Sequence, residues 1–258
     1  MLYIQKEICP DDIQSQIDTL IGTEEWDNIP EEPSPEQVKI IREEYFNQLE
    51  KTSIRKSLIS EQHGICAYCM VQIENSGEST TIEHFVPLSK SKSGSMDYKN
   101  WLAVCKGGQN IEPLPGENRI VCCDVKKKGQ IPNLSPFNRS QMERISYYDD
   151  GTIFYDGSTK RERNRYNGEI NNIFGLNGTI DLHTGRSRRD TTTGIVKQRK
   201  DAYIAMRDLL QELDSNGELT SDNIDKIRDD LLSETMWEPF IGVKLYVLRL
   251  FSEYLSNS

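Results

Sequence analysis

The segment C-A-Y-C at residues 66–69 opens the stretch that decides the fold, which continues through T-I-E-H-F-V-P-L (81–88), Y-K-N-W-L (98–102), Cys105 and C-C-D-V-K-K-K-G (122–129). Five of the six cysteines of the 258-residue chain lie in this stretch. It also carries a Glu-His pair and a run of lysines. This density of thiol, carboxylate and imidazole groups predicts a compact module built around metal ions.

The compartment decides how these cysteines are interpreted. No segment approaches the roughly 18 to 20 uninterrupted apolar residues of a membrane span. The first residues also lack the basic and apolar regions of a signal peptide. We therefore expect a cytoplasmic protein with no membrane partner. In that reducing compartment, clustered cysteines favour metal thiolates over disulfides.

A structural zinc ion takes four thiolate or imidazole ligands at tetrahedral corners, and C-x2-C spacing lets one tight turn present two of them. Cys66 and Cys69 supply that turn. The second pair is expected from Cys105 with either Cys122 or Cys123. A redox dithiol is the alternative, but thioredoxin-type motifs open a helix after a βα unit, whereas this motif precedes further cysteines.

Groups suited to hydrolysis lie beside the cysteines. A neutral His84 could deprotonate a water molecule. Glu83 and Asp124 offer the hard oxygen ligands that Mg²⁺ or Mn²⁺ prefers. Asn100 is expected to orient the His84 imidazole through its amide oxygen. The lysines that follow Asp124 are placed to bind backbone phosphates; they are Lys126, Lys127 and Lys128.

Local patterns predict the elements around this chemistry. Ser34, Pro35 and Gln37 form a capping-box signature that starts a helix over 35–50, with a second helical stretch to about 62. Alternation predicts a hairpin of strands 70–74 and 80–86. The remaining expectations are a loop over 89–104, an insertion over 106–121, a helix from about Asp124, a hairpin over 147–155, a basic helix over 160–175, an irregular stretch over 176–193, and helices over 194–213, 220–234 and 239–256.

The formal charge of −10 hides two basic regions. Residues 1–60 and 201–258 each carry a net charge of −7, whereas residues 86–130 carry +4 and residues 158–200 carry +6. Local basic surfaces between acidic ends suit a protein that holds nucleic acid in its middle. Solvated charged faces are the simpler alternative.

The ordered motifs resemble the HNH nuclease superfamily, whose zinc-stapled members read C-x2-C, D-H-x-x-P, N-L and C-x2-C-N-x-x-K-G. This resemblance implies a ββα-metal core in which His84 is the general base and Glu83 and Asp124 bind the catalytic ion. Glu83 replaces the commoner Asp, and Asp124 the commoner Asn or His. Register against C-N-x-x-K favours Cys123 as the fourth zinc ligand, with Cys122 as the alternative.

The fold expected on this basis is α+β, with a small zinc-stapled ββα-metal (HNH) core embedded between mainly α-helical N- and C-terminal segments. The expected organisation is an N-terminal helical arm (1–62), the core with its zinc (63–140), a hairpin and basic helical extension (141–193), and a C-terminal helical segment for partner docking (194–258).

A narrower resemblance is to HNH proteins encoded beside ABC-type or overcoming-lysogenisation-type ATPases in Septu and retron anti-phage systems. It is carried by Q-H-G-I-C-A-Y-C (62–69), E-H-F-x-P (83–87), L-S-P (134–136) and I-F-G-L-N (173–177). It implies an ATPase partner, in retrons together with an RNA–DNA molecule, and a DNA or tRNA substrate. A non-catalytic zinc-stapled module that binds nucleic acid or a partner is the rival interpretation.

Overall fold

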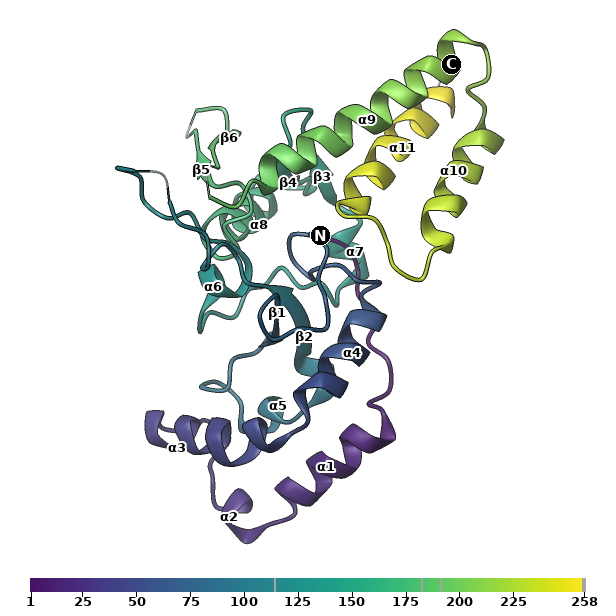
Figure 1. The fold of residues 1–258 in the computed structure, drawn as a ribbon. Helices are drawn as coiled ribbons and strands as arrows, with labels where there is room; N and C mark the ends of the chain where they lie inside the picture. The colour runs from purple at the N-terminus through teal and green to yellow at the C-terminus, as the bar shows by residue number, and fades with distance from the viewer. Residues whose placement is uncertain (114, 182, 191, 257–258) are drawn as a thin grey trace.

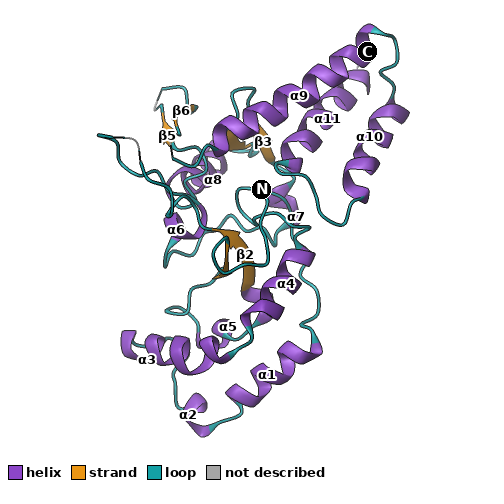
Figure 2. Ribbon diagram, viewed as in Figure 1, coloured by secondary structure: helices purple, strands orange, loops and turns teal. Residues whose placement is uncertain are grey.

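The computed structural model describes residues 1–113, 115–181, 183–190 and 192–256, and it combines many helices with short strands (Figures 1 and 2). The expected α+β class is confirmed. Leu114 of the expected insertion, Leu182 and Thr191 of the expected irregular stretch, and residues 257–258 of the expected C-terminal segment lie outside the described residues.

The N-terminal half contains α1 (Asp11–Ile21), α2 (Glu24–Asp27), α3 (Pro35–Ile40), the π-helical turn η1 (Ile41–Tyr45), the 3-10 turn η2 (Phe46–Gln48), α4 (Lys51–Glu61), β1 (Thr80–His84), α5 (Lys92–Ser95), the 3-10 turn η3 (Tyr98–Asn100), β2 (Trp101–Cys105) and α6 (Cys123–Lys127). The C-terminal half contains α7 (Arg139–Met142), β3 (Ile145–Tyr147), β4 (Ile153–Tyr155), α8 (Lys160–Asn172), β5 (Thr179–Ile180), β6 (Ser187–Arg189), α9 (Ile195–Ser215), α10 (Ser221–Ser233) and α11 (Ile241–Ser256).

The predicted capping box starts α3. The Ser34 hydroxyl accepts a hydrogen bond from Gln37 N, and the Gln37 side chain accepts one from Ser34 N at 2.9 Å. The chain does not continue as one α-helix to residue 50, however, because it passes through the π-helical and 3-10 turns and becomes extended at Leu49. Ile41 and Phe46 in these turns are both buried, so the irregular winding directs both toward the core.

The central hairpin differs from the predicted one. β1 pairs antiparallel with β2, and His84 lies opposite Trp101. Residues 70–74, which were predicted to pair with β1, do not do so. Residues 64–73 instead fold back on themselves around the C-x2-C turn. Cys66 N donates to Val71 O, and Ile73 N donates to Gly64 O. The missed strand, W-L-A-V-C, has the unbroken apolar pattern of a strand buried on both faces.

The other strands form small ribbons. In the described residues, β3 pairs with β4 and β5 pairs with β6, both antiparallel. The β3–β4 hairpin turns at Asp150-Gly151 as predicted, with Gly151 at φ +87°. The β5–β6 ribbon lies in the stretch expected to be irregular.

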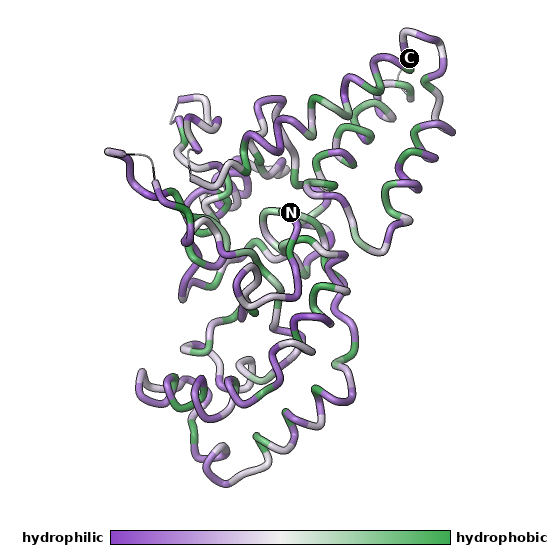
Figure 3. Tube along the Cα trace, viewed as in Figure 1, coloured by the Kyte–Doolittle hydropathy of each residue, from purple (hydrophilic) through white to green (hydrophobic). Residues whose placement is uncertain are grey.

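Two hydrophobic clusters hold the molecule together. The larger draws residues from the N-terminal arm, the central hairpin, α8 and the start of α11, so these segments share one core. The smaller lies among α9, α10 and α11, and Leu210, Ile224 and Val247 are buried in it. Beyond the first turns of α9 and α11, which belong to the larger cluster, these three helices project from the rest of the chain (Figure 1). Hydrophobic and hydrophilic stretches alternate along α9 and α11 (Figure 3), as expected for helices packed on one side.

Candidate metal centre and active site

Four cysteine sulfurs lie close enough together to bind one metal ion. The Sγ atoms of Cys66, Cys69, Cys105 and Cys123 are all within 4.8 Å of one another. Individual sulfur pairs are 3.6 Å apart for Cys69 and Cys105 and 3.7 Å apart for Cys105 and Cys123. Cys105 N also donates to Cys66 Sγ at 3.3 Å, a contact that stabilises a thiolate. This set of donors fits a metal ion such as zinc.

Cys123 completes this group of four, although its neighbour Cys122 is also buried, with its sulfur 3.5 Å from Cys123 Sγ. Cys123 has a left-handed backbone at φ +57°, which is unfavourable for a residue with a Cβ. Its amide donates to Phe174 O at 2.9 Å. A contact from a distant part of the chain therefore holds Cys123 in the conformation that directs its sulfur to the cluster.

A pocket of about 470 Å³ contains three of the predicted catalytic residues. Glu83 and His84 come from the end of β1, and Asp124 comes from the first turn of α6. The remaining lining residues come from the N-terminal arm, from β1, from the segment after it and from the end of α6; they are Val38, Arg42, Phe46, Asn47, Ile82, Pro87, Leu88, Ser89, Lys128 and Gly129.

His84 is held as a neutral imidazole. Its Nε2 lies 2.8 Å from Ser95 O. Because a carbonyl oxygen can only accept, we assign the ring proton to Nε2, which leaves Nδ1 with a free lone pair. Burial lowers the pKa of His84 to about 4, and the nearby charges of Lys51, Lys127 and Arg42 lower it further. Phe46 packs edge-on against the ring, with centroids 4.5 Å apart.

Lys127 does not have the phosphate-binding role predicted for it. Its side chain is completely buried, with Nζ 2.6 Å from Glu83 Oε1 and 3.2 Å from His84 O. It turns inward because a buried carboxylate needs a compensating charge. Lys126 and Lys128 are exposed, and Lys128 lines the pocket, so these two lysines remain free to contact phosphate.

The Glu83 carboxyl lies in a crowded and largely dry environment. Burial raises the pKa of this carboxyl, and a hydrogen bond and repulsion from Asp124 contribute, while the buried Lys127 ammonium opposes the rise. Two carboxyl groups at hydrogen-bonding distance repel each other when both are ionised, and a cation between them removes that repulsion. Glu83 and Asp124 therefore lie beside each other in the pocket.

Asn100 does not orient His84, which corrects the prediction. Its Oδ1 accepts from Val86 N at 2.8 Å, and its Nδ2 donates to Val86 O at 2.9 Å and to Gly94 O at 2.8 Å. The amide thus fastens both ends of the 86–94 loop. The contact to the imidazole comes instead from Ser95 O, and Ser95 immediately follows the segment that Asn100 holds.

The N-terminal arm contributes residues that motif reasoning missed. Arg42 on the π-helical turn and Phe46 on the turn after it line the pocket with His84. Only the pocket geometry identifies them, because the sequence marks this segment as an ordinary amphipathic helix. Arg42 adds an exposed cation to the pocket wall.

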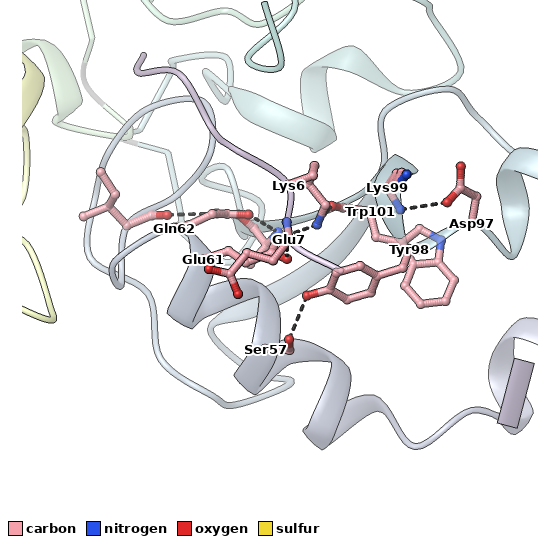
Figure 4. Close-up of polar contacts among 11 residues, drawn as sticks. Lys6, Glu7, Ser57, Glu61, Gln62, Asp97, Tyr98, Lys99 and Trp101 are labelled. Atoms are coloured by element: carbon pink, nitrogen blue, oxygen red, sulfur yellow. Dashed lines mark hydrogen bonds and ion pairs between the residues drawn. The ribbon is translucent and has the colours of Figure 1, made fainter. Parts of the chain in front are cut away.

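Polar contacts fasten the N-terminal segment and α4 to the free edge of β2 (Figure 4). Gln62 donates to Ala103 O at 2.7 Å and accepts from Ala103 N at 2.8 Å, as a neighbouring strand would. Lys6 pairs with Glu61 at 2.6 Å and donates to Trp101 O at 3.2 Å. These contacts fix β2, and β2 in turn fixes the position of His84 on β1.

Comparisons with known proteins leave the family open, since no family model matches the chain and a search of curated proteins finds no match. Within the described residues, no helix is both long and apolar enough to cross a membrane.

Proposed function

We propose that this protein is a metal-dependent endonuclease of the HNH superfamily that hydrolyses phosphodiester bonds in nucleic acid. The observation that carries the proposal is one pocket lined by a neutral imidazole, His84, and by two adjacent carboxyl groups, Glu83 and Asp124. The four-cysteine cluster supports it, because a zinc-stapled HNH core requires such a cluster beside the catalytic residues.

The pocket geometry supports a role for each residue. His84 Nδ1 accepts the proton of the attacking water, while Nε2–H remains bound to Ser95 O. Asn100 positions Ser95 by fastening the preceding loop. Glu83 and Asp124 would hold Mg²⁺ or Mn²⁺, which when bound supplies charge stabilisation at the scissile phosphate. Lys128 and Arg42 on the pocket wall attract the nucleic-acid backbone.

Replacing His84 tests the catalytic role. The variant His84→Ala should lower the rate of Mg²⁺-dependent cleavage of plasmid DNA or tRNA by about 10² to 10⁴, because a positioned base contributes that much. His183→Ala, which removes an exposed histidine, is the matched control and should retain parental activity. Parental cleavage by a folded, metal-loaded His84→Ala would refute the proposal.

The Glu83–Lys127 ion pair supports a second candidate, a non-catalytic module that binds nucleic acid. Lys127 already supplies a positive charge at the carboxylate that the divalent ion would use. Glu83→Gln and Asp124→Asn distinguish the two functions. An endonuclease loses Mg²⁺-dependent cleavage in both variants but keeps its affinity for nucleic acid, whereas a binding module shows no cleavage before or after the change.

We further propose that an ATPase encoded beside this protein docks on the α9–α11 unit. Support comes from the separate hydrophobic cluster of this unit and from the net charge of −7 over residues 201–258. Co-expression with the product of the adjacent reading frame tests the proposal. Co-purification that is lost when exposed Leu209 and Leu232 are replaced by Ser would support it, and co-purification unaffected by those changes would refute this docking surface.

A further inference from the structure

Arg199 is a completely buried arginine that the proposed reaction does not use. It lies in the second turn of α9. Its Nε donates to Gly151 O at 2.7 Å, and its Nη2 donates to Leu176 O at 2.5 Å and to Asn177 Oδ1 at 3.1 Å. Its Nη1 has no hydrogen-bond partner. All of these partners are neutral oxygens.

A buried guanidinium whose hydrogen bonds all go to neutral oxygens is costly, because these bonds satisfy its donors without balancing its charge. Within the described residues, no carboxylate lies within ion-pair distance of Arg199. Burial lowers its pKa, while Tyr147, Cys69, Asp190 and Cys122 oppose that effect. Of these four groups, Cys69 belongs to the cysteine cluster and Cys122 precedes Cys123 of that cluster. When four thiolates bind a divalent ion, a net negative charge remains, and this charge can balance Arg199.

A short backbone path also joins Arg199 to a cysteine of the cluster. Arg199 holds Leu176 and Asn177, and two residues before Leu176 the carbonyl of Phe174 accepts from Cys123 N. Between them, Gly175 (φ +63°) lies so close to the cysteine segment that a Cβ would be 2.6 Å from Val121 O. The segment 174–177 therefore packs directly on the backbone that carries Cys122 and Cys123.

The same segment also touches the C-x2-C turn, since the ring of Tyr68 lies 4.8 Å from that of Phe174. On its other side, Asn177 pairs with the backbone of Ile153, donating to Ile153 O and accepting from Ile153 N. Arg199 thus lies where α9, the β3–β4 hairpin and the 174–177 segment meet behind the cysteines.

We propose that Arg199 is a positioning residue for the metal centre: its charge balances the zinc-loaded thiolates, and its hydrogen bonds fix the segment that holds Cys123. Metal binding and the docking of α9 are coupled as a consequence. This inference rests on the cysteine cluster and is independent of nuclease activity.

Zinc affinity tests the inference. Competition against a chromophoric chelator should show that Arg199→Met weakens zinc binding about 10- to 100-fold, the usual loss when a partner outside the ligand set is removed. Arg199→Lys should lose less zinc affinity, because it keeps the positive charge. It should still lose some, because an ammonium lacks the planar set of donors of a guanidinium. Lys200→Met, which removes the exposed neighbouring cation, is the matched control and should bind zinc as the parent does.

A second measurement uses the unaltered protein and does not depend on whether a variant folds. Removing zinc with a chelator should increase amide hydrogen exchange in residues 174–177 and 195–200. A third measurement compares variants. Co²⁺ in the site reports thiolate coordination by its charge-transfer absorption, and Arg199→Lys should alter that spectrum while Lys200→Met should not. Parental zinc affinity in a folded Arg199→Met, or exchange in 195–200 that zinc removal leaves unchanged, would overturn the inference.

Discussion

Single buried titratable groups control the candidate site, and His84 is the clearest case. An unfolded imidazole takes up a proton near pH 6.5, whereas folded His84 does so only near pH 4. The folded state therefore loses stability as the pH falls through this window, because the unfolded state binds more protons there. Above about pH 6.5 the imidazole is neutral in both states and adds no pH dependence.

This difference gives a prediction for stability. The parent should lose about 2 kcal/mol more than His84→Gln between pH 7 and pH 5, because glutamine cannot be protonated. Urea denaturation at the two pH values, without added divalent ions, measures the loss. Exposed His183→Gln is the control and should follow the parent. Equal losses in the parent and His84→Gln would contradict the stated pKa.

The two lysines at the end of α6, Lys126 and Lys127, should also behave differently from each other. Lys127→Met leaves the Glu83 carboxyl without its buried partner and should destabilise the fold by about 3 kcal/mol. The exposed Lys126→Met should change stability by no more than about 0.5 kcal/mol. Chemical denaturation compares the two, and similar stabilities would show that Lys127 is not the buried partner of Glu83.

At the scale of elements, the β1–β2 hairpin depends on the side chain that covers its edge. Gln62 bonds both backbone groups of Ala103, and Ala67 N also donates to Ala103 O, so Gln62→Ala leaves the buried Ala103 N–H without its partner. The free energy of unfolding should fall by about 2 kcal/mol. The exposed Gln109→Ala is the control, and denaturant titration measures both. A loss no larger than that of the control would mean that β2 does not need this edge contact.

The irregular helical segment α3–η1–η2 contributes side chains to the candidate pocket. The π-helical turn carries Arg42 and the 3-10 turn carries Phe46, and both residues line the pocket. Local irregularities of this kind often occur at functional sites. The sequence predicts where the segment begins, through its capping box, but not this irregular winding, which depends on the core against which it packs.

At the scale of the whole molecule, charge is divided between segments. The exposed Arg161 and Arg165 of α8 lie in the basic region and should contact phosphates. Replacing both with Gln should weaken nucleic-acid binding and reduce the slope of log affinity against log salt by about 1.8 for duplex DNA. Arg207→Gln on α9, in the acidic C-terminal region, is the control. An unchanged slope in the double variant would place the nucleic-acid surface elsewhere.

The sequence by itself determined the groups that act over short separations. The C-x2-C pair, the Glu83-His84 pair at a strand end, the capping box at Ser34 and the Asp150-Gly151 turn all follow from spacing and local propensity. Tertiary structure decided which residues meet across long separations. It pairs β1 with β2 and buries Lys127 against Glu83. It also directs the Asn100 amide to the 86–94 loop instead of to His84, and it packs Arg199 against the segment that contacts Cys123. The physical reason is that buried charges and backbone groups must find partners, and only the folded chain shows which partners lie within reach.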